Sequence, residues 1–311
     1  MNVSRSGFYK WRSITRYHKR TNREEVIEDV KRVHEEHKTH GYRWVANYLE
    51  KKEGKNYSEG MVYQAWRFLE LKCESKHQPK MKKKSTKSKN KNITENLIYS
   101  TWDTVDRPYQ VVVSDMTAFS FKWLYFELTL FFDVFFKGII AYRVAARRGS
   151  RLQYIDGLED VRKKLIDEPY PVIIHTDRGS VYTSNEFNKL FKLDSKFKRS
   201  MSRAGKPGDN PMNEAFNGWI KEELIIDFGI DNCTNHKEVL AVVEKYVYYF
   251  NNERPCWAIG YNIPLQYKKM YEDGLLEHKD TFEHRVLSEI PKSVRKKLKK
   301  AENQENVHSK K

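Results

Sequence analysis

Two stretches of the chain, Val-Val-Val-Ser-Asp-Met-Thr at residues 111–117 and Val-Ile-Ile-His-Thr-Asp-Arg-Gly at residues 172–179, decide the fold. Each begins with a run of β-branched residues, which is typical of a buried strand. Each run is followed by an aspartate, Asp115 in the first and Asp177 in the second, where we expect the strand to end. Because such strand ends meet at one edge of a sheet, the two stretches predict a pair of neighbouring carboxylates.

A third acidic stretch, Gly-Asp-Asn-Pro-Met-Asn-Glu-Ala-Phe at residues 208–216, adds Glu214 at the start of a predicted helix. Glu222 and Glu223 on the same helix are alternatives to it. The Asp-Asn-Pro start places Glu214 in the first turn, near the sheet edge, and we therefore favour it as the third carboxylate.

Three carboxylates offer hard oxygen ligands, which suit Mg²⁺ or Mn²⁺ better than zinc. The pattern predicts a site for two such ions, with Asp115 bridging them and Asp177 and Glu214 each holding one. A pair of ions of this kind activates an oxygen nucleophile and stabilises the leaving oxygen in phosphodiester cleavage. His175 lies two residues before Asp177 on the same strand face, and we interpret it as a packing or ligand-supporting residue.

The order of the predicted elements places these residues in one domain. Strands are expected at 109–113, 123–132, 138–145, 171–175 and 197–200, and helices at 150–166, 185–193, 210–226 and 236–251. Three strands with short breaks, a helix, a strand, a short helix and a further strand form the order of a ribonuclease-H-like α/β sheet.

Composition divides the chain into four parts. Residues 1–75 predict short helices, including 24–36 with three valines on one face, as in helix-turn-helix-like DNA-binding modules and in simple packing units. Residues 76–100 predict a lysine-rich linker, and residues 101–272 the catalytic core. Residues 273–311 predict a basic, flexible tail.

The charge of the chain indicates a polyanionic partner. Among 311 residues the net charge is +16, and nucleic acid is the simplest partner for that excess, although a merely soluble basic protein is the alternative. Eight lysines and no acid lie between residues 76 and 92. We expect Lys82, Lys83 and Lys84 to contact DNA phosphates, unless the segment is only a solvated tether.

Five residues near the predicted carboxylates are candidates for binding DNA. They are Arg178, Arg203, Lys206, Asn217 and Lys221. The last two lie three and seven positions after Glu214, so they share its helical face. The alternative for that face is an ordinary solvated surface.

The chain carries no sign of export or of a membrane anchor. Cys73, Cys233 and Cys256 form neither a disulfide framework nor a Cys-x-x-Cys pair, and no signal peptide opens the chain. The most apolar stretch, 124–146, is interrupted by charged residues. We therefore expect a protein of the reducing cytosol that does not span a membrane.

Several blocks together resemble the transposases of the insertion-sequence-three group, in particular their integrase-like second-frame product. The blocks are Val-Ser-Arg-Ser-Gly-Phe-Tyr-Lys-Trp (3–11), His-Gly-Tyr-Arg-Trp (40–44), the three acidic stretches, Tyr-Phe-Asn-Asn-Glu-Arg-Pro (249–255) and Gly-Tyr-Asn-Ile-Pro (260–264). The resemblance runs from about residue 3 to residue 271. It departs from the family pattern at His40, which replaces a tyrosine, and at Trp44, which replaces an arginine. The 36 residues between Asp177 and Glu214 are one more than is usual.

The resemblance implies a DDE transposase, with Asp115, Asp177 and Glu214 as catalytic metal ligands, that cuts element ends and joins the 3′-hydroxyl directly to DNA. It implies DNA as partner, a first-frame domain or fusion product, a homo-oligomer on DNA, and a place in the bacterial cytoplasm at the nucleoid. One alternative is a catalytically silent DNA-binding derivative that regulates transposition. Another is a nuclease acting on RNA–DNA hybrids, which the amino-terminal helices disfavour. The presence of all three carboxylates favours the transposase.

Overall fold

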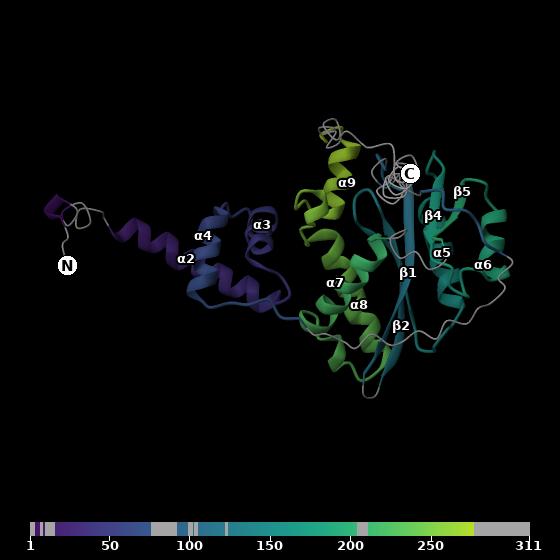
Figure 1. Ribbon diagram of the computed structural model, residues 1–311, viewed down its shortest axis with the longest axis horizontal. Helices are drawn as coiled ribbons and strands as arrows, with labels where there is room; N and C mark the ends of the chain where they lie inside the picture. Colours follow the sequence, from purple (N-terminus) through teal and green to yellow (C-terminus); the bar gives the residue numbers. More distant parts are fainter. Residues whose placement is uncertain are drawn as a thin grey trace, which may run out of the picture.

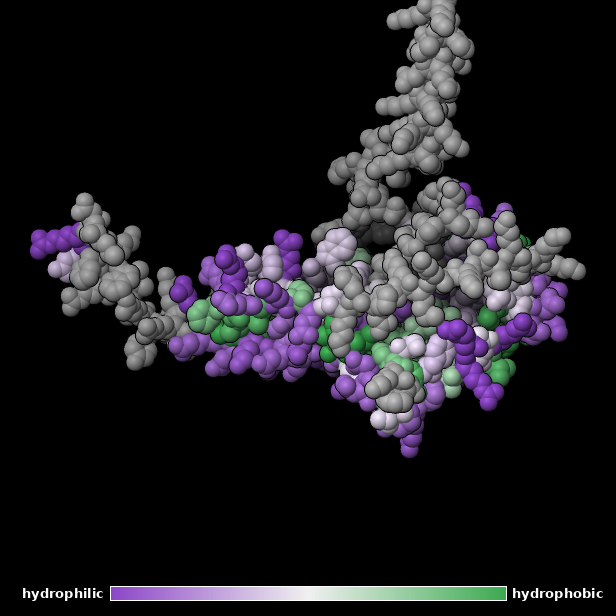
Figure 2. All heavy atoms as spheres, turned by 60° about the horizontal axis from the view of Figure 1, so that its bottom comes forward, coloured by the Kyte–Doolittle hydropathy of each residue, from purple (hydrophilic) through white to green (hydrophobic). Residues whose placement is uncertain are grey.

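The computed structural model shows a small helical module beside a larger α/β domain (Figure 1). It describes residues 4–6, 9, 16–75, 92–98, 102, 105–121, 124–203 and 211–276, without the side chains of 16–22 and 211–217. Hydrophilic residues dominate the face displayed in Figure 2, and hydrophobic residues form small separate patches on it. Within the described ranges, none of the helices has the length and apolar character needed to cross a membrane.

The larger domain is built on a five-stranded sheet in the order β3-β2-β1-β4-β5. The strands are β1 (Val111–Ser120), β2 (Tyr125–Asp133), β3 (Ile139–Ala145), β4 (Val172–Thr176) and β5 (Phe197–Met201). The first three form an antiparallel meander, β4 is parallel to β1, and β5 is parallel to β4. This mixed arrangement is the ribonuclease-H-like order that the sequence predicted.

The first strand is longer than its β-branched run predicted. That run ends at Val113, but β1 continues to Ser120 because its later residues pair one by one with β2. Thr117 and Phe119 are buried in this second half, so the alternation of polar and apolar residues matches a strand. Asp115 therefore lies inside β1 rather than beyond its end.

Helices cover both faces of the sheet (Figure 1). Those of one face are α5 (Leu152–Lys164) and α6 (Asn185–Lys189), and those of the other are α7 (Pro211–Ile226) and α8 (His236–Asn252), with α9 (Pro264–Glu272) packed on α8. Short 3₁₀ turns are η2 (Leu190–Lys192), η4 (Ile230–Asn232) and η5 (Trp257–Ile259). Alternate residues of the strands thus enter two separate cores, one under α5 and one under α7 and α8.

The amino-terminal module consists of α2 (Arg16–Glu36), α3 (Tyr42–Glu53) and α4 (Glu59–Phe68). The three valines predicted on one face of its first helix are Val26, Val30 and Val33, and all three are buried against α3 and α4. Ser58 caps α4 by accepting a hydrogen bond from the backbone N–H of Met61. The helical character of residues 24–36 and the inward face of that helix are therefore confirmed.

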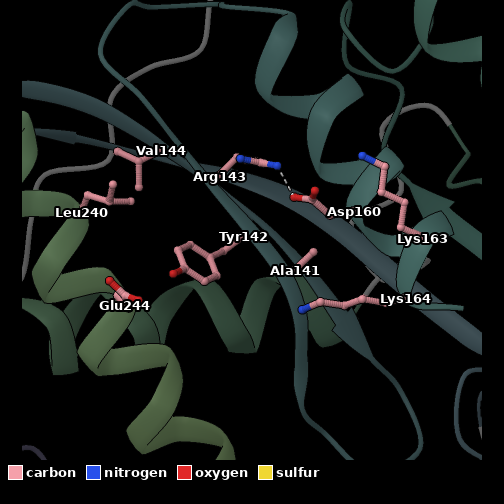
Figure 3. Close-up of a pocket in the computed structure, with 9 residues that line it drawn as sticks. All are labelled: Ala141, Tyr142, Arg143, Val144, Asp160, Lys163, Lys164, Leu240 and Glu244. Atoms are coloured by element: carbon pink, nitrogen blue, oxygen red, sulfur yellow. Dashed lines mark ion pairs between the residues drawn. The ribbon is translucent and has the colours of Figure 1, made fainter.

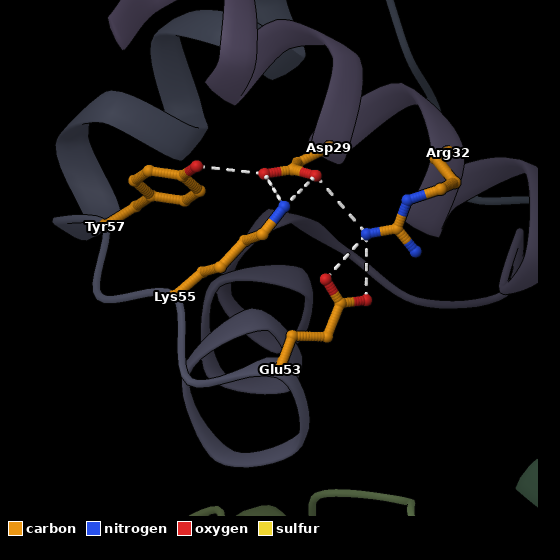
Figure 4. Close-up of polar contacts among 5 residues, drawn as sticks. All are labelled: Asp29, Arg32, Glu53, Lys55 and Tyr57. Atoms are coloured by element: carbon orange, nitrogen blue, oxygen red, sulfur yellow. Dashed lines mark hydrogen bonds and ion pairs between the residues drawn. The ribbon is translucent and has the colours of Figure 1, made fainter.

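A polar network joins α2 to the end of α3 and to the loop that follows α3 (Figure 4). Lys55 Nζ donates to both carboxylate oxygens of Asp29 at 2.6 and 2.7 Å, and the Tyr57 hydroxyl donates to Asp29 at 2.9 Å. Arg32 Nη2 bonds both oxygens of Glu53 at 2.8 and 2.7 Å. Burial alone would raise the pKa of Asp29, but the hydrogen bonds from its basic and phenolic neighbours hold that pKa below its ordinary value.

Candidate catalytic site

Asp115 and Asp177 lie beside each other on neighbouring parallel strands. Ser114 of β1 is in register with Thr176 of β4, and the residues that follow are Asp115, within β1, and Asp177, directly after β4. Neighbouring strands are about 4.8 Å apart, and residues in register face the same side of a sheet. Both aspartates are half-buried. The fold therefore brings two of the three predicted carboxylates to one place.

A tight turn holds the carboxylate of Asp177. The backbone N–H of Gly179 donates to Asp177 Oδ1 at 2.8 Å. A Cβ atom at position 179 would lie 2.9 Å from that same oxygen, which is closer than real Cβ contacts allow. The glycine two positions after Asp177 is therefore explained by sterics, because only glycine lets the backbone approach the carboxylate so closely.

Two buried tyrosines, Tyr154 and Tyr182, lie close enough to Asp115 and Asp177 to be affected by the charges of both. Tyr182 is fully buried and shares a 2.9 Å hydrogen bond with Ser114, and its ring packs edge-on against Tyr154 at 5.0 Å. Burial raises the pKa of both phenols, and the two aspartates raise the pKa of each further. From the sequence, Tyr182, five residues after Asp177, is expected to offer a hydroxyl near a phosphate, whereas Tyr154 was not predicted to lie here.

His175 is a packing residue. It is fully buried, and its two ring nitrogens lie 2.8 Å from the Ser200 hydroxyl and 3.0 Å from the Ser202 hydroxyl. The ring of Trp102 meets it edge-on at 5.5 Å. This environment supports β4 next to β5, as the packing interpretation predicted.

Helix α7 covers the face of the sheet on which the two aspartates lie. Its Ile220 and Leu224 are fully buried in the same core as Val113 of β1. Lys221 Nζ lies 5.8 Å from the ring centre of Phe119, which is on the same face of β1 as Asp115. Position 214 lies seven residues before Lys221, so helical spacing puts both positions on one side of α7. The side chain of Glu214 itself lies outside the described residues.

The two alternative acids of α7 are engaged elsewhere. The carboxylate of Glu223 is buried and accepts three hydrogen bonds from Arg254, at 3.0, 3.0 and 2.6 Å. Glu222 accepts a 2.7 Å hydrogen bond from the hydroxyl of Ser75. Glu223 is therefore committed to an internal ion pair, a role that the sequence did not indicate.

Three of the predicted DNA-binding residues near the carboxylates have described side chains. Arg178 follows Asp177 directly and donates from Nε to the carbonyl of Ser202 at 2.8 Å. Arg203 is exposed just past β5, and Lys221 is half-buried on α7. The remaining predicted contacts, Lys82, Lys83, Lys84, Lys206 and the side chain of Asn217, lie outside the described residues.

The donor chemistry of Asp115 and Asp177 fits a hard divalent cation, since both supply carboxylate oxygens. Among the side chains that the structure describes, no group of three or more His, Cys, Asp or Glu is placed to hold a metal ion. The predicted trio needs Glu214, whose side chain is outside that set. Position 214 lies in α7, which packs against β1.

A cavity of about 620 Å³ lies elsewhere, around the edge strand β3 (Figure 3). Its lining combines Arg143 of β3, which forms a 2.5 Å ion pair with Asp160 of α5, and Leu240 and Glu244 of α8. None of the predicted catalytic residues lines it.

A family model described as "Integrase core domain" matches residues 195–264, a segment that includes Glu214 but neither aspartate. The putative transposase InsK of insertion sequence element IS150 from Escherichia coli (strain K12) is 27% identical over 272 residues, which cover 86% of this chain and 90% of the relative. The chain is therefore similar to transposases of insertion sequences. The 31 kDa protein of insertion element IS600 from Shigella sonnei is also 27% identical, over 277 residues that cover 86% of this chain and 96% of that protein.

Among solved structures, the catalytic core domain of HTLV-2 integrase in complex with magnesium gives a TM-score of 0.39. It is 18% identical to this chain, and the match covers 52% of this chain and 97% of that one.

Proposed function

We propose that the chain cuts and joins DNA strands at the ends of an insertion sequence, with Asp115, Asp177 and Glu214 as ligands of two Mg²⁺ or Mn²⁺ ions. The observation that supports the proposal is the parallel register of β1 and β4, which ends at Ser114 and Thr176, one residue before each aspartate. When bound, such ions activate the attacking oxygen and stabilise the charge on the leaving oxygen. The similarity to transposases of insertion sequences supports DNA as the substrate.

The protein's own residues hold and orient the reactants. The Gly179 N–H fixes the carboxylate of Asp177. In the proposal, Arg178, Arg203 and Lys221 neutralise DNA phosphates and fix the register of the substrate. Lys206 and Asn217 complete this set in the proposal.

We assign the other roles by the same reasoning. Residues 1–75 bind DNA, residues 76–100 link and contact phosphates through Lys82, Lys83 and Lys84, residues 101–272 catalyse, and residues 273–311 form a basic tail. The chain acts as the second-frame product, together with a first-frame domain or fusion, and as a homo-oligomer on DNA at the nucleoid.

Strand joining with an oligonucleotide of the element end tests this function. We expect joining to depend on Mg²⁺ or Mn²⁺, and Asp177→Asn to abolish it while DNA binding stays nearly intact, because an amide oxygen is a poor ligand for the ion. Asp156→Asn, at an exposed position of α5, is the matched control and should join normally. Normal joining by Asp177→Asn would reject the site.

The choice of the third carboxylate has its own test in the same assay. Glu222→Gln should join normally, whereas Glu214→Gln should fail. An equal loss for both variants would return the choice between these two glutamates to an open question and contradict the assignment made here.

A further inference from the structure

In the block His-Gly-Tyr-Arg-Trp at residues 40–44, His40 and Trp44 face the inside of the molecule, whereas Arg43 is exposed. Trp44 is 7% exposed, and its ring stacks on His40 with the ring centres 3.9 Å apart and the planes 10° from parallel. His37, one turn earlier at the end of α2, is buried and stacks on Tyr249 of α8 at 5.0 Å. These side chains are therefore placed to dock the module on the α/β domain, and they are closed off from DNA.

Polar contacts at this junction join the module to the end of α7. The backbone N–H and hydroxyl of Thr39 donate to the carboxylate of Asp227 at 3.2 and 2.6 Å. Trp44 Nε1 donates to the carbonyl of Pro255 at 3.0 Å. His40 Nε2 lies 3.5 Å from Glu223 Oε1. The module thus contacts Glu223 and Asp227, which lie at the carboxyl-terminal end of α7 and just after it.

The α/β domain supplies the other half of the junction from α8 and from Arg254, two residues after its end. Arg254 holds Glu223 through Nε and Nη2, and the Tyr246 hydroxyl donates to Glu223 Oε2 at 2.9 Å. Glu223 is 2% exposed and Arg254 5% exposed. A buried ion pair with this many hydrogen bonds has a defined geometry, and removing one partner leaves an uncompensated buried charge.

We propose that these contacts form a clasp, made of Thr39, His40, Trp44, Glu223, Asp227 and Arg254, that positions α7 and thereby Glu214. Glu223 and Arg254 are positioning residues for the third carboxylate, and His40 and Trp44 dock the module. The inference rests on the proposed function only in the role given to Glu214.

Because α7 is one continuous helix, contacts at its carboxyl-terminal end affect the position of residue 214 near its start. Position 214 lies nine residues before Glu223 on this continuous helix, which is about 13.5 Å along the axis at 1.5 Å per residue. A tilt of about 5° about the clasp would move position 214 by about 1.2 Å, and a misplacement of about 1 Å can cost a hundredfold in rate. Docking of the module is therefore part of the geometry of the site.

The test loosens the clasp from the module side, so that the core keeps its own contacts. The variant combines Thr39→Val with Trp44→Ala in the full chain. We expect the Mg²⁺ concentration for half-maximal strand joining to rise about tenfold, the range found when residues that support metal ligands are changed. Hydrogen exchange of the α7 amides should become faster, and that of β1 and β4 should stay unchanged.

Two further variants separate positioning from general stability. Arg32→Ala breaks the network of Figure 4 inside the module, away from the clasp, and should leave the Mg²⁺ dependence unchanged. A variant with Thr39→Val and Trp44→Phe keeps a stacking ring at position 44, and its Mg²⁺ midpoint should be much closer to the wild-type value than that of the variant with Trp44→Ala. An unchanged Mg²⁺ midpoint and unchanged α7 exchange in the double variant would overturn the proposal, as would an equal shift with Arg32→Ala. If the wild type shows no metal-dependent joining, the proposed function fails, and the α7 exchange still decides the clasp.

Discussion

At the scale of single residues, we expect substitution of the smallest residue of the candidate site, Gly179, to have a large effect on the position of the Asp177 carboxylate. Gly179 donates its N–H to Asp177 Oδ1, and a methyl group there would lie 2.9 Å from that oxygen. The carboxylate is the movable end of a side chain, so it would turn away at little cost in stability. The residue that bears the chemistry would be displaced without damage to the fold.

We therefore expect Gly179→Ala to reduce strand joining about 10- to 100-fold, the usual effect of losing a contact that supports a metal ligand. The melting temperature should change little, and calorimetry beside the joining assay measures both. Gly60→Ala in α4 is the control, since a Cβ atom there meets nothing within 4 Å. Full activity of Gly179→Ala would show that the turn does not hold the carboxylate in its active position.

At the scale of elements, the sequence predicted the number and order of the strands but not where the first one ends. The valine run predicts a strand that ends at Val113, whereas pairing with β2 extends β1 to Ser120. The register that pairs Asp115 with Asp177 is a tertiary property and has no local signal. The same holds for the contact of His40 and Trp44 with the core, because their partners lie about 180 to 210 residues away.

The end of α2 should make the protein sensitive to acid. Burial, and then the charge of Arg254, lower the pKa of His37 to about 4, against about 6.5 in the unfolded chain. His37 is neutral in the folded state, so its contribution to stability is complete above pH 6.5 and is lost as the pH falls from there toward 4. At pH 5 the loss is about 2 kcal/mol. Burial also lowers the pKa of His40, so His40 likewise destabilises the fold as the pH falls. Burial raises the pKa of Asp227 to about 7, so Asp227 instead destabilises the fold as the pH rises.

Urea unfolding at pH 5 and pH 8 measures this effect as a difference between proteins. Wild type should lose about 2 kcal/mol more than His37→Gln over that interval, because the contributions of His40 and Asp227 are common to both. His236→Gln, at an exposed position, should follow the wild type. Parallel losses in wild type and His37→Gln would mean that His37 does not titrate between these pH values.

At the scale of the whole molecule, the net charge of +16 should govern how strongly any DNA is bound. The eight lysines of residues 76–92 lie outside the described residues, and their effect can be predicted from charge alone. Each phosphate neutralised on duplex DNA adds about 0.9 to the slope of log affinity against log salt. Replacing the eight lysines by glutamine should flatten that slope and weaken all sequences alike in a filter-binding titration. An unchanged slope would identify the segment as a simple tether.

The clasp also bears on how such proteins can be recombined in the laboratory. Its halves are separated by 188 residues between Thr39 and Asp227 and by 211 between Trp44 and Pro255. A chimera that takes its first 75 residues from a relative would combine two surfaces that were not matched to each other. Retargeting by exchange of the amino-terminal helices alone would thus disturb the core, and a sound graft has to transfer positions 223, 227 and 254 together with the helices.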